Sequence, residues 1–385
     1  MSIPFEQAVR SLNPGQTVRL EPGSPIYRGP YTTTVLGVSP DGVRVAVPMD
    51  EGKLVLLPVG TRVKVGLPSD APVSAVELQI SMRTGGKDRA LLLSPIRSTP
   101  GGESRSGAAR RSGVPVIAVS SGKGGVGKST LVVNLGIALS QRGRRVCIID
   151  ADLGTANVDV LLNLSAPYNL AHVIHGQKHM LEVVVQGPED MIVLPGGSGF
   201  QDLTTLSEES FRVLLSQFRR LEEYADILLI DTGSGLSPNV TNFICAATEA
   251  VLITTPEPHA ITDCYALIKV LASQGGHPPL SLVVNRVESE REGEHIARKM
   301  TFASKRFLHT ELRTLGSIVE DPAVARSVRK QSPVTLEEPR ARASLQIGAV
   351  ADALLDVGRE TLEAPGTRGF LERMRRLIAF GRAQV

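Results

Sequence analysis

A glycine-rich stretch with two lysines constrains the fold of this chain more than any other part of the sequence. It reads Gly122-Lys123-Gly124-Gly125-Val126-Gly127-Lys128-Ser129-Thr130. An apolar, β-branched run, Val116–Ser121, comes before it, and a stretch of helical character, Thr130–Arg142, comes after it. The spacing is that of a P-loop, G-x-x-x-x-G-K followed by Ser or Thr, in the strand–loop–helix order that such a loop needs. The sequence therefore predicts a site for the phosphates of a nucleotide.

Each residue type in this loop has a chemical reason. Glycines let successive backbone N–H groups turn toward phosphate oxygens, and the helix N-terminus adds the positive end of its dipole. Lys128 is predicted to neutralise the β- and γ-phosphates, and the Ser129 hydroxyl to ligate Mg²⁺. A dinucleotide fingerprint, G-x-G-x-x-G, is excluded because it does not end in Lys-Ser. The residues expected to bind the nucleotide are Gly122, Gly124, Gly125, Val126, Gly127, Lys128, Ser129 and Thr130.

Two apolar runs end in carboxylates. The run Val146–Asp150 leads into Asp150-Ala151-Asp152, and the run Ile227–Asp231 leads into a glycine-rich loop. In doubly wound folds the chemistry lies at the carboxyl ends of the strands. Asp152 is predicted to position or deprotonate the attacking water, Asp150 to order the surroundings of the metal, and Asp231 to reach the Mg²⁺ shell. A turn cap is the alternative for the first two. The expected metal-site residues are Ser129, Asp150, Asp152 and Asp231.

The pattern of apolar runs changes along the chain and divides it into four segments. Residues 1–96 contain short Val-rich runs between Pro-Gly and Pro-Asp-Gly turns, which predicts a small all-β, barrel-like domain. Residues 97–113 are rich in Gly, Ser and Arg, and we expect a flexible basic linker there. Residues 114–365 alternate apolar runs with helical stretches, which predicts an α/β domain with a doubly wound, mostly parallel sheet. Residues 366–385 form a separate tail. The runs expected as strands of the sheet are 116–121, 146–150, 191–194, 227–231, 250–255, 280–287 and 315–319.

Composition excludes several classes of protein. Hydrophobic residues make up 42% of the chain and charged residues 21%, as in a globular protein with a real core. The three cysteines form no CxxC pair, which argues against a disulfide framework and against a cysteine-ligated metal within one chain. We expect no signal peptide and no spanning helix, because the sequence lacks the apolar runs that either needs. The net charge of +3 is too small to predict a direct nucleic-acid partner, and we expect the chain in the cytoplasm.

The first lysine of the loop carries a family resemblance. The stretch KGGVGKS resembles the deviant Walker A motif of the MinD/ParA ATPases, which are P-loop NTPases of the SIMIBI class. The resemblance implies ATP as the nucleotide, slow and partner-stimulated hydrolysis to ADP and phosphate, and a homodimer that closes around ATP. It also implies that Lys123 crosses the dimer to the partner's phosphates, so that Lys123, Lys128 and Asp152 form the catalytic set. A solvated loop lysine is the alternative for Lys123.

Two further nucleotide-binding positions are assigned through the same resemblance. Asn285 ends the run LSLVVN, where the family has an Asn that reads the adenine edge. Asp321 lies in the stretch 315–323, which resembles the family segment that packs on the base. For any residue of that stretch, an ordinary strand and helix cap is the alternative.

The sequence around the predicted carboxylates resembles one branch of that family. DADLGTANVDVLLN and DTGSGLS are similar to the FlhG subfamily of MinD-like ATPases, over roughly residues 114–380. This resemblance implies control of flagellar number and placement. The implied partners are an FlhF-like GTPase and either flagellar C-ring proteins or a flagellar transcription regulator. Two alternatives stay open: an ATPase for division-site or cargo positioning, and a ligand-sensing adaptor with a nearly silent ATPase.

The first segment carries a resemblance of its own. The runs LNPGQTVRLEP, TTTVLGV and VAVPMDEGKLVLLPVGTRVKVGL resemble the N-terminal domain of the flagellar protein YcgR. The cyclic di-GMP motifs of that protein do not occur in this chain, so we do not expect that ligand. The resemblance implies a domain that recruits a flagellar or regulatory partner, with a purely structural appendage as the alternative.

The tail is amphipathic. On a helix its apolar residues share one stripe, which Arg368, Arg373, Arg375 and Arg376 flank. A short basic helix of this kind can lie among the headgroups of an anionic membrane. We therefore expect peripheral attachment to the inner face of the cell membrane, with the pole as a candidate location. A terminal helix docked on its own domain is the alternative. The residues expected to face the membrane are Phe370, Leu371, Met374, Leu377 and Ile378.

Overall fold

The computed structural model divides the chain into two compact units, Met1–Ala108 and Ala109–Val385. It describes residues 9, 11–22, 29–40, 42–50, 53–55, 57, 62–68, 74–84, 90–95, 113–152, 157–197, 208–222, 224–357 and 366–382. Almost all of the segment expected as a linker, residues 97–113, lies outside the described residues. Each unit is described by itself.

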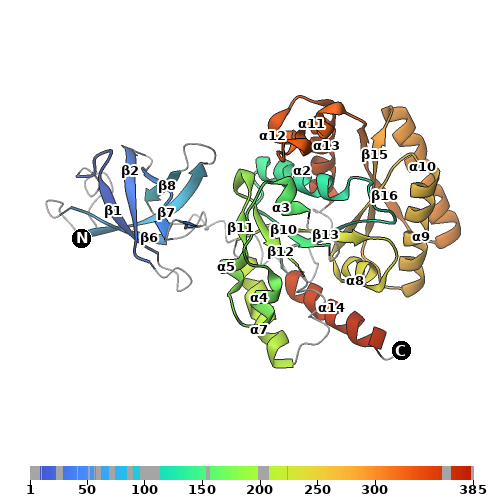
Figure 1. Cartoon of the computed structure of the whole chain (residues 1–385), viewed down its shortest axis with the longest axis horizontal. Coiled ribbons are helices and arrows are strands. Elements are labelled where there is room, and N and C mark those ends of the chain that lie inside the picture. The colour runs from blue at the N-terminus through green and yellow to red at the C-terminus, as the bar shows by residue number, and fades with distance from the viewer. Residues whose placement is uncertain are drawn as a thin grey trace, which may run out of the picture. The chain divides into compact units, whose positions relative to one another are not determined.

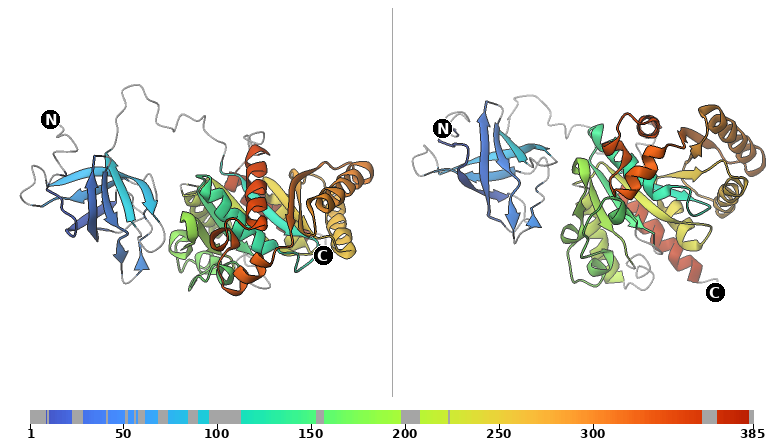
Figure 2. Two further views of the ribbon diagram at one scale, coloured as in Figure 1. Left: turned by 90° about the horizontal axis from the view of Figure 1, so that it is seen from above. Right: turned by 45° about the horizontal axis from the view of Figure 1, so that its top comes forward.

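The first unit contains a closed barrel of six antiparallel strands (Figures 1 and 2). The strands are β1 (Thr17–Pro22), β2 (Tyr31–Ser39), β3 (Gly42–Ala46), β6 (Arg62–Gly66), β7 (Ala75–Thr84) and β8 (Ala90–Pro95). They pair in the order β1-β2-β3-β8-β7-β6, and β6 closes on β1. Alternate side chains point into the barrel, as a period of two residues predicts: Val18 and Leu20 of β1 and Val63 and Val65 of β6 are buried. The predicted barrel-like domain is therefore confirmed.

A second, smaller sheet accompanies the barrel in this unit. β5 (Lys53–Leu54) pairs only with β4 (Met49–Asp50), outside the barrel. Val55 and Leu57 follow as buried residues of the barrel core. These two described residues therefore fill the core of the barrel.

The second unit is built on a sheet of eight strands (Figure 1). They are β9 (Val116–Ser121), β10 (Val146–Ala151), β11 (Val185–Gln186), β12 (Ile192–Pro195), β13 (Ile227–Ser234), β14 (Glu249–Thr254), β15 (Leu280–Val287) and β16 (Leu312–Val319). Their order is β11-β12-β10-β13-β9-β14-β15-β16, and only the pair β11–β12 is antiparallel. Strands β9, β10 and β14 are buried at every residue. Burial on both faces explains why their sequences are continuous apolar runs. The predicted doubly wound, mostly parallel sheet is confirmed.

Helices cover both faces of this sheet (Figure 2). The elements are α2 (Lys128–Gln141), α3 (Val158–Leu161), α4 (Leu170–Ile174), α5 (Met180–Val183), η1 (Pro188–Asp190), α7 (Glu208–Leu221), α8 (Pro238–Ala246), α9 (Pro258–Gln274), α10 (Glu290–Leu308), α11 (Pro322–Arg329), α12 (Val334–Glu337), α13 (Arg342–Val357) and α14 (Gly366–Arg382). Alternate residues of β9 show the division: Ile117 and Val119 pack with α2 and α13, whereas Val116 and Ala118 face the clusters of α7, α8, α9, α10 and α14. Among the helices that the structure describes, none has the length and apolar character that crossing a membrane requires.

Candidate functional site

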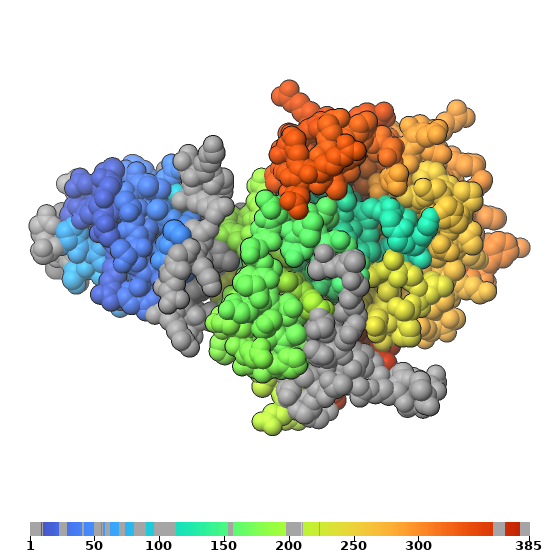
Figure 3. Space-filling model, in the orientation of Figure 1, coloured from blue at the N-terminus to red at the C-terminus, as the bar shows by residue number. Residues whose placement is uncertain are grey.

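The P-loop lies between β9 and α2, at the carboxyl end of a central strand. Gly125 and Gly127 have φ angles of +80° and +92°, in the left-handed region that glycine adopts readily. A Cβ on Gly122 would lie 2.2 Å from the carbonyl oxygen of Asp263, so this glycine lets the loop pack directly on α9. In Figure 3 the turquoise segment that contains the loop reaches the surface between the orange segment of α11 and α12 and the yellow segment of α8 and α9. The loop is thus preshaped and open to a ligand.

The strand register brings the predicted carboxylates to this loop. Asp150 of β10 lies opposite Asp231 of β13, and Asp231 lies opposite Val119 of β9, close to the end of the strand that leads into the loop. Because parallel strands end at one edge of the sheet, two aspartates that are 81 positions apart in the sequence become neighbours. Three adjacent strands therefore contribute to one site.

Lys128 and Asp231 form a buried ion pair at the base of the site. Lys128 Nζ donates to Asp231 Oδ1 at 2.8 Å and lies 3.9 Å from Asp152 Oδ2. The Lys128 side chain is 8% exposed, Asp231 is fully buried and Asp152 is 20% exposed. Burial raises the pKa of the Asp231 carboxyl, and the charge and hydrogen bond of Lys128 oppose that rise. The lysine thus neutralises a carboxylate that water cannot reach.

Ser129 and Asp231 fit a magnesium ion. The Ser129 hydroxyl lies close enough to Asp231 to help lower the pKa of its carboxyl. The second oxygen of that carboxylate, Oδ2, is buried and has no hydrogen-bond partner among the described residues. Proteins bind Mg²⁺ through a small number of carboxylate or hydroxyl oxygens, and phosphate oxygens and water complete the shell. A buried, unpaired carboxylate oxygen beside the P-loop is the group that such an ion would satisfy.

Asp150 braces the loop that follows β10. Its Oδ1 accepts the N–H of Asp152 at 3.2 Å, and its Oδ2 accepts the N–H groups of Asn157 and Val158 at 3.2 and 3.3 Å. Burial raises the pKa of this carboxyl to about 6, although the three backbone hydrogen bonds oppose the rise. These contacts order the loop after β10, and the role of Asp150 near the metal stays a prediction. The segment 153–156 of the same loop lies outside the described residues.

Lys123 makes a contact that the sequence analysis did not anticipate. Its carbonyl oxygen accepts the Ser121 hydroxyl at 2.8 Å, and its Nζ contacts Nε2 of His259, in the first turn of α9. His259 follows β14, which neighbours β9 in the sheet. Its position just past the end of a strand was the one available signal, but the strand order that makes it a neighbour of Lys123 cannot be deduced from a single sequence.

Asn285 lies against the P-loop. Its Nδ2 donates to the carbonyl oxygen of Val126 at 2.7 Å. A Cβ on Gly127 would lie 2.5 Å from the same Nδ2, and the φ of +92° at this position favours glycine. The side chain therefore ties β15 to the backbone of the loop. The contact of Asn285 with adenine stays a prediction.

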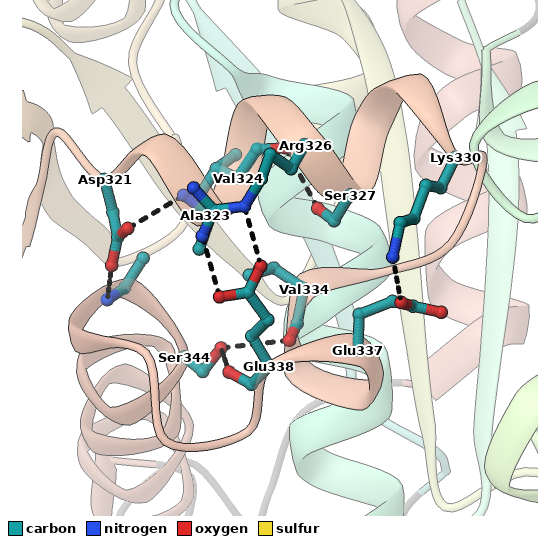
Figure 4. Close-up of polar contacts among 11 residues, drawn as sticks. Asp321, Ala323, Val324, Arg326, Ser327, Lys330, Val334, Glu337, Glu338 and Ser344 are labelled. Carbon is teal, nitrogen blue, oxygen red and sulfur yellow. Dashed lines mark hydrogen bonds and ion pairs between the residues drawn. The ribbon is translucent and has the colours of Figure 1, made fainter.

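Asp321 caps α11 (Figure 4). Its Oδ1 accepts the N–H of Ala323 at 2.9 Å, and its Oδ2 accepts the N–H of Ala343 at 3.2 Å. The hydrogen bond from Ala323 is the largest cause of the lowered pKa of this carboxyl. The described contacts are those of a helix cap, the alternative kept open above, and a contact with the base stays a prediction.

A link between α2 and α12 was missed. Asn134 Oδ1 accepts both the N–H and the hydroxyl of Thr335, at 3.0 and 2.9 Å, and Nδ2 donates to the carbonyl of Thr130 at 2.8 Å. The guanidinium of Arg326 donates two hydrogen bonds, of 3.0 and 2.8 Å, to the carboxylate of Glu338 (Figure 4). The segment α11–α12 is thereby tied to the helix that starts in the P-loop. A polar residue in the middle of an apolar helix was the available signal.

The tail helix α14 is docked on its own domain. Phe370, Leu371 and Met374 are 1%, 0% and 3% exposed, in a cluster with residues of α7 and α8. Leu377 is half-buried, and the side chain of Ile378 lies outside the described residues. The described residues of the stripe expected to face a membrane therefore pack on the protein, which is the alternative stated above.

Polar contacts fix the position of α14. The guanidinium of Arg373 donates to the carbonyl of Ala246 at 2.9 and 2.5 Å and to that of Ala247 at 3.1 Å, at the end of α8. At the start of α14, the hydroxyl and N–H of Thr367 donate to the carboxylate of Glu222. The start and the middle of α14 are thus held by specific partners.

Family models match both units. A model described as the CobQ/CobB/MinD/ParA nucleotide binding domain matches residues 117–334. A model described as flagellar protein YcgR matches residues 13–95.

Curated relatives cover the second unit. The chain is 42% identical over 238 residues to the antiactivator FleN of Pseudomonas aeruginosa, which covers 62% of this chain and 85% of FleN. It is 31% identical over 265 residues to the flagellum site-determining protein YlxH of Helicobacter pylori, with 67% and 88% covered. The septum site-determining protein MinD of Bacillus subtilis is 29% identical over 245 residues, with 62% and 88% covered.

Solved structures share the fold of the second unit. The cell division ATPase MinD of Pyrococcus furiosus superposes with a TM-score of 0.51 and 26% identity, over 63% of this chain and 99% of MinD. A chain of the MinC:MinD complex from Aquifex aeolicus gives 0.50 and 25%, over 63% and 96%.

Proposed function

Because this chain belongs to the MinD/ParA family of nucleotide-binding proteins, and within it to the FleN/YlxH group, we propose that it is an ATPase that controls the number and placement of flagella. The observation that carries the proposal is a P-loop with two lysines. Lys128 is buried and donates to Asp231, and Lys123 lies at an exposed position beside His259. FleN is described as an antiactivator and YlxH as a flagellum site-determining protein. The match of the first unit to the YcgR model supports a flagellar role independently.

The geometry supports ATP hydrolysis with defined roles. The backbone of the loop binds the phosphates, and Lys128 moves from Asp231 to neutralise the β- and γ-phosphates. Ser129 and Asp231 would hold Mg²⁺, which when bound neutralises phosphate charge. Asp152 lies beside Lys128 and is partly exposed, so it can position the attacking water and accept its proton. Hydrolysis would be slow in the isolated chain and would accelerate with a partner.

Dimerisation is the second element of the proposal. Lys123 follows the first glycine of the loop, and its side chain lies at an exposed position, from which it can cross to the phosphates of a second chain. A triphosphate buried between two chains needs positive charge from both sides. ATP would therefore stabilise the dimer, and hydrolysis would return the monomer.

Membrane attachment through α14 is the third element. The loop after β13 leads directly into α8, and Arg373 of α14 donates to the last carbonyls of α8. A movement of α8 on ATP binding would loosen α14 and free its apolar stripe for an anionic bilayer. One short amphipathic helix binds a membrane weakly, whereas a dimer presents two. Attachment to the inner face of the membrane would then follow the nucleotide state.

The Arg373→Lys variant tests this release. Lysine keeps the charge that attracts anionic lipid but loses the forked pair of donors on Ala246 and Ala247, so the docked state alone is weakened. We expect the ADP-bound variant to bind vesicles of mixed zwitterionic and anionic phospholipid at least about threefold more tightly than the wild type. Arg376→Lys, at an exposed position on the same helix, is the control. Equal vesicle binding by both variants would contradict release from α8.

The proposed partners follow from the relatives. An antiactivator acts by opposing an activator, which supports a flagellar transcription regulator as one partner. An FlhF-like GTPase and flagellar C-ring proteins are the other proposed partners, and the YcgR-like unit is proposed to recruit one of them.

A flagellar count by electron microscopy tests the function. Lys123→Ala removes the crossing lysine without disturbing the buried pair of Lys128 and Asp231, so the protein should accumulate normally. We expect altered flagellar number or position in these cells. Lys299→Ala, an exposed lysine of α10, should leave the count unchanged. A normal count with stable Lys123→Ala protein would instead favour division-site or cargo positioning, which the similarity to MinD supports.

A further inference from the structure

We propose that His259 is a positioning residue that holds Lys123 within its own chain until the ATP dimer closes. The inference rests on the proposed function, because it concerns the lysine proposed to cross the dimer. Lys123 Nζ contacts Nε2 of His259 across an exposed part of the surface. An ammonium can only donate a hydrogen bond, so Nε2 is the acceptor in this pair.

The packing of the P-loop on α9 produces this contact. Gly122 lies so close to the carbonyl of Asp263 that no side chain fits between them. His259 lies four residues before Asp263, on the same face of the helix, and therefore beside the residue that follows Gly122. The Ser121 hydroxyl holds the carbonyl of Lys123 at 2.8 Å. The backbone of Lys123 is thus fixed, and its side chain lies at the start of α9.

The charges around the pair favour the same arrangement. Glu257 is the residue before α9, and its pKa is lowered first by the hydrogen bond from Thr255 and then by the nearby positive charge of Lys123. Arg286 is paired with Glu320 at 2.7 Å. Within its own chain Lys123 is therefore offered both a hydrogen-bond acceptor and a carboxylate.

Dimer closure must break this contact in both chains. Lys123 cannot reach a partner's phosphates while it donates to His259, so the contact competes with the ATP dimer. A hydrogen bond between exposed side chains is weak, and its loss should favour closure by about threefold per chain. The dimer loses one such contact in each chain, so removing both should lower the dissociation constant of the dimer by about tenfold.

The test measures dimerisation of the full chain with Mg²⁺ and a non-hydrolysable ATP analogue, by sedimentation velocity. We expect His259→Ala to dimerise about tenfold more tightly than the wild type. His259→Gln should stay near the wild type, because its amide oxygen can accept from Lys123. His295→Ala, an exposed histidine of α10, is the matched control.

A double-mutant comparison separates this inference from the proposed function. If His259 acts through Lys123, His259→Ala should change nothing in a chain that already carries Lys123→Ala. Unchanged or weaker dimerisation of His259→Ala, or an equal gain in the Lys123→Ala chain, would overturn the inference alone. If Lys123→Ala dimerises and hydrolyses ATP like the wild type, the crossing lysine itself is wrong, and both proposals fall.

Discussion

Lys128→Ala should abolish ATP hydrolysis and also destabilise the second unit, by about 3 kcal/mol. The loss of hydrolysis, of about a hundredfold or more, follows from removing the charge that faces the phosphates. The loss of stability has a separate cause. Asp231 is fully buried, so water does not solvate its charge. Without Lys128 it becomes an uncompensated buried carboxylate. Urea unfolding and a phosphate-release assay measure the two effects.

A second substitution distinguishes the two causes. Asp231→Asn in the Lys128→Ala chain removes the buried charge and should restore most of the stability, while hydrolysis stays lost. The pH dependence gives an independent check. Because burial raises the pKa of Asp231, protonation removes the unfavourable charge at low pH, so the deficit of Lys128→Ala should shrink toward pH 4 and grow toward pH 8. A Lys128→Ala chain as stable as the wild type at pH 8 would contradict the buried-pair argument.

Removing residues 366–385 should cost the second unit about 5 kcal/mol or more, because α14 is part of its core. Phe370, Leu371 and Met374 are buried, and the loss of a large buried apolar side chain costs about 2–5 kcal/mol each. The truncation would also expose the apolar faces of α7 and α8 that α14 covers. We expect a lower unfolding midpoint and a poor soluble yield.

The control for the truncation keeps the helix and removes exposed charges. Arg368→Ala with Arg376→Ala in the full chain should leave the unfolding midpoint nearly unchanged, since both side chains are exposed. If the truncated chain were as stable as the full one, α14 would be a detachable membrane anchor and nothing more. The expected instability means that loss of function after truncation would not by itself demonstrate a role at the membrane.

The fold could be predicted because its signals are local. The P-loop pattern needs eight adjacent residues, and the apolar runs of β9, β10, β13 and β15 are long and bounded by turns. The predicted and observed ends of the strands differ by a few residues; β16, for example, begins at Leu312 rather than Leu315. Strand edges depend on pairing partners, which a single sequence does not reveal.

The site could be predicted less completely, because several side chains are placed by tertiary packing. The residue types of the loop and the three aspartates follow from phosphate and metal chemistry. That Asn285 would hold the loop backbone and that Asp321 would cap α11 depends on distances between elements. The tail shows the same limit. An apolar stripe flanked by arginines has the same sequence pattern whether it faces lipid or packs on its own domain, so the pattern does not distinguish the two.

Closure of the first unit has a consequence for how such a chain could arise by gene fusion. An open sheet carries an edge strand with unpaired N–H and C=O groups, which can pair with any neighbouring strand. The six described strands of the barrel leave no such edge, because β6 hydrogen-bonds to β1. The strands of the barrel therefore offer a neighbouring domain no edge for strand invasion. Joining such a barrel to another domain therefore leaves its strand pairing unchanged.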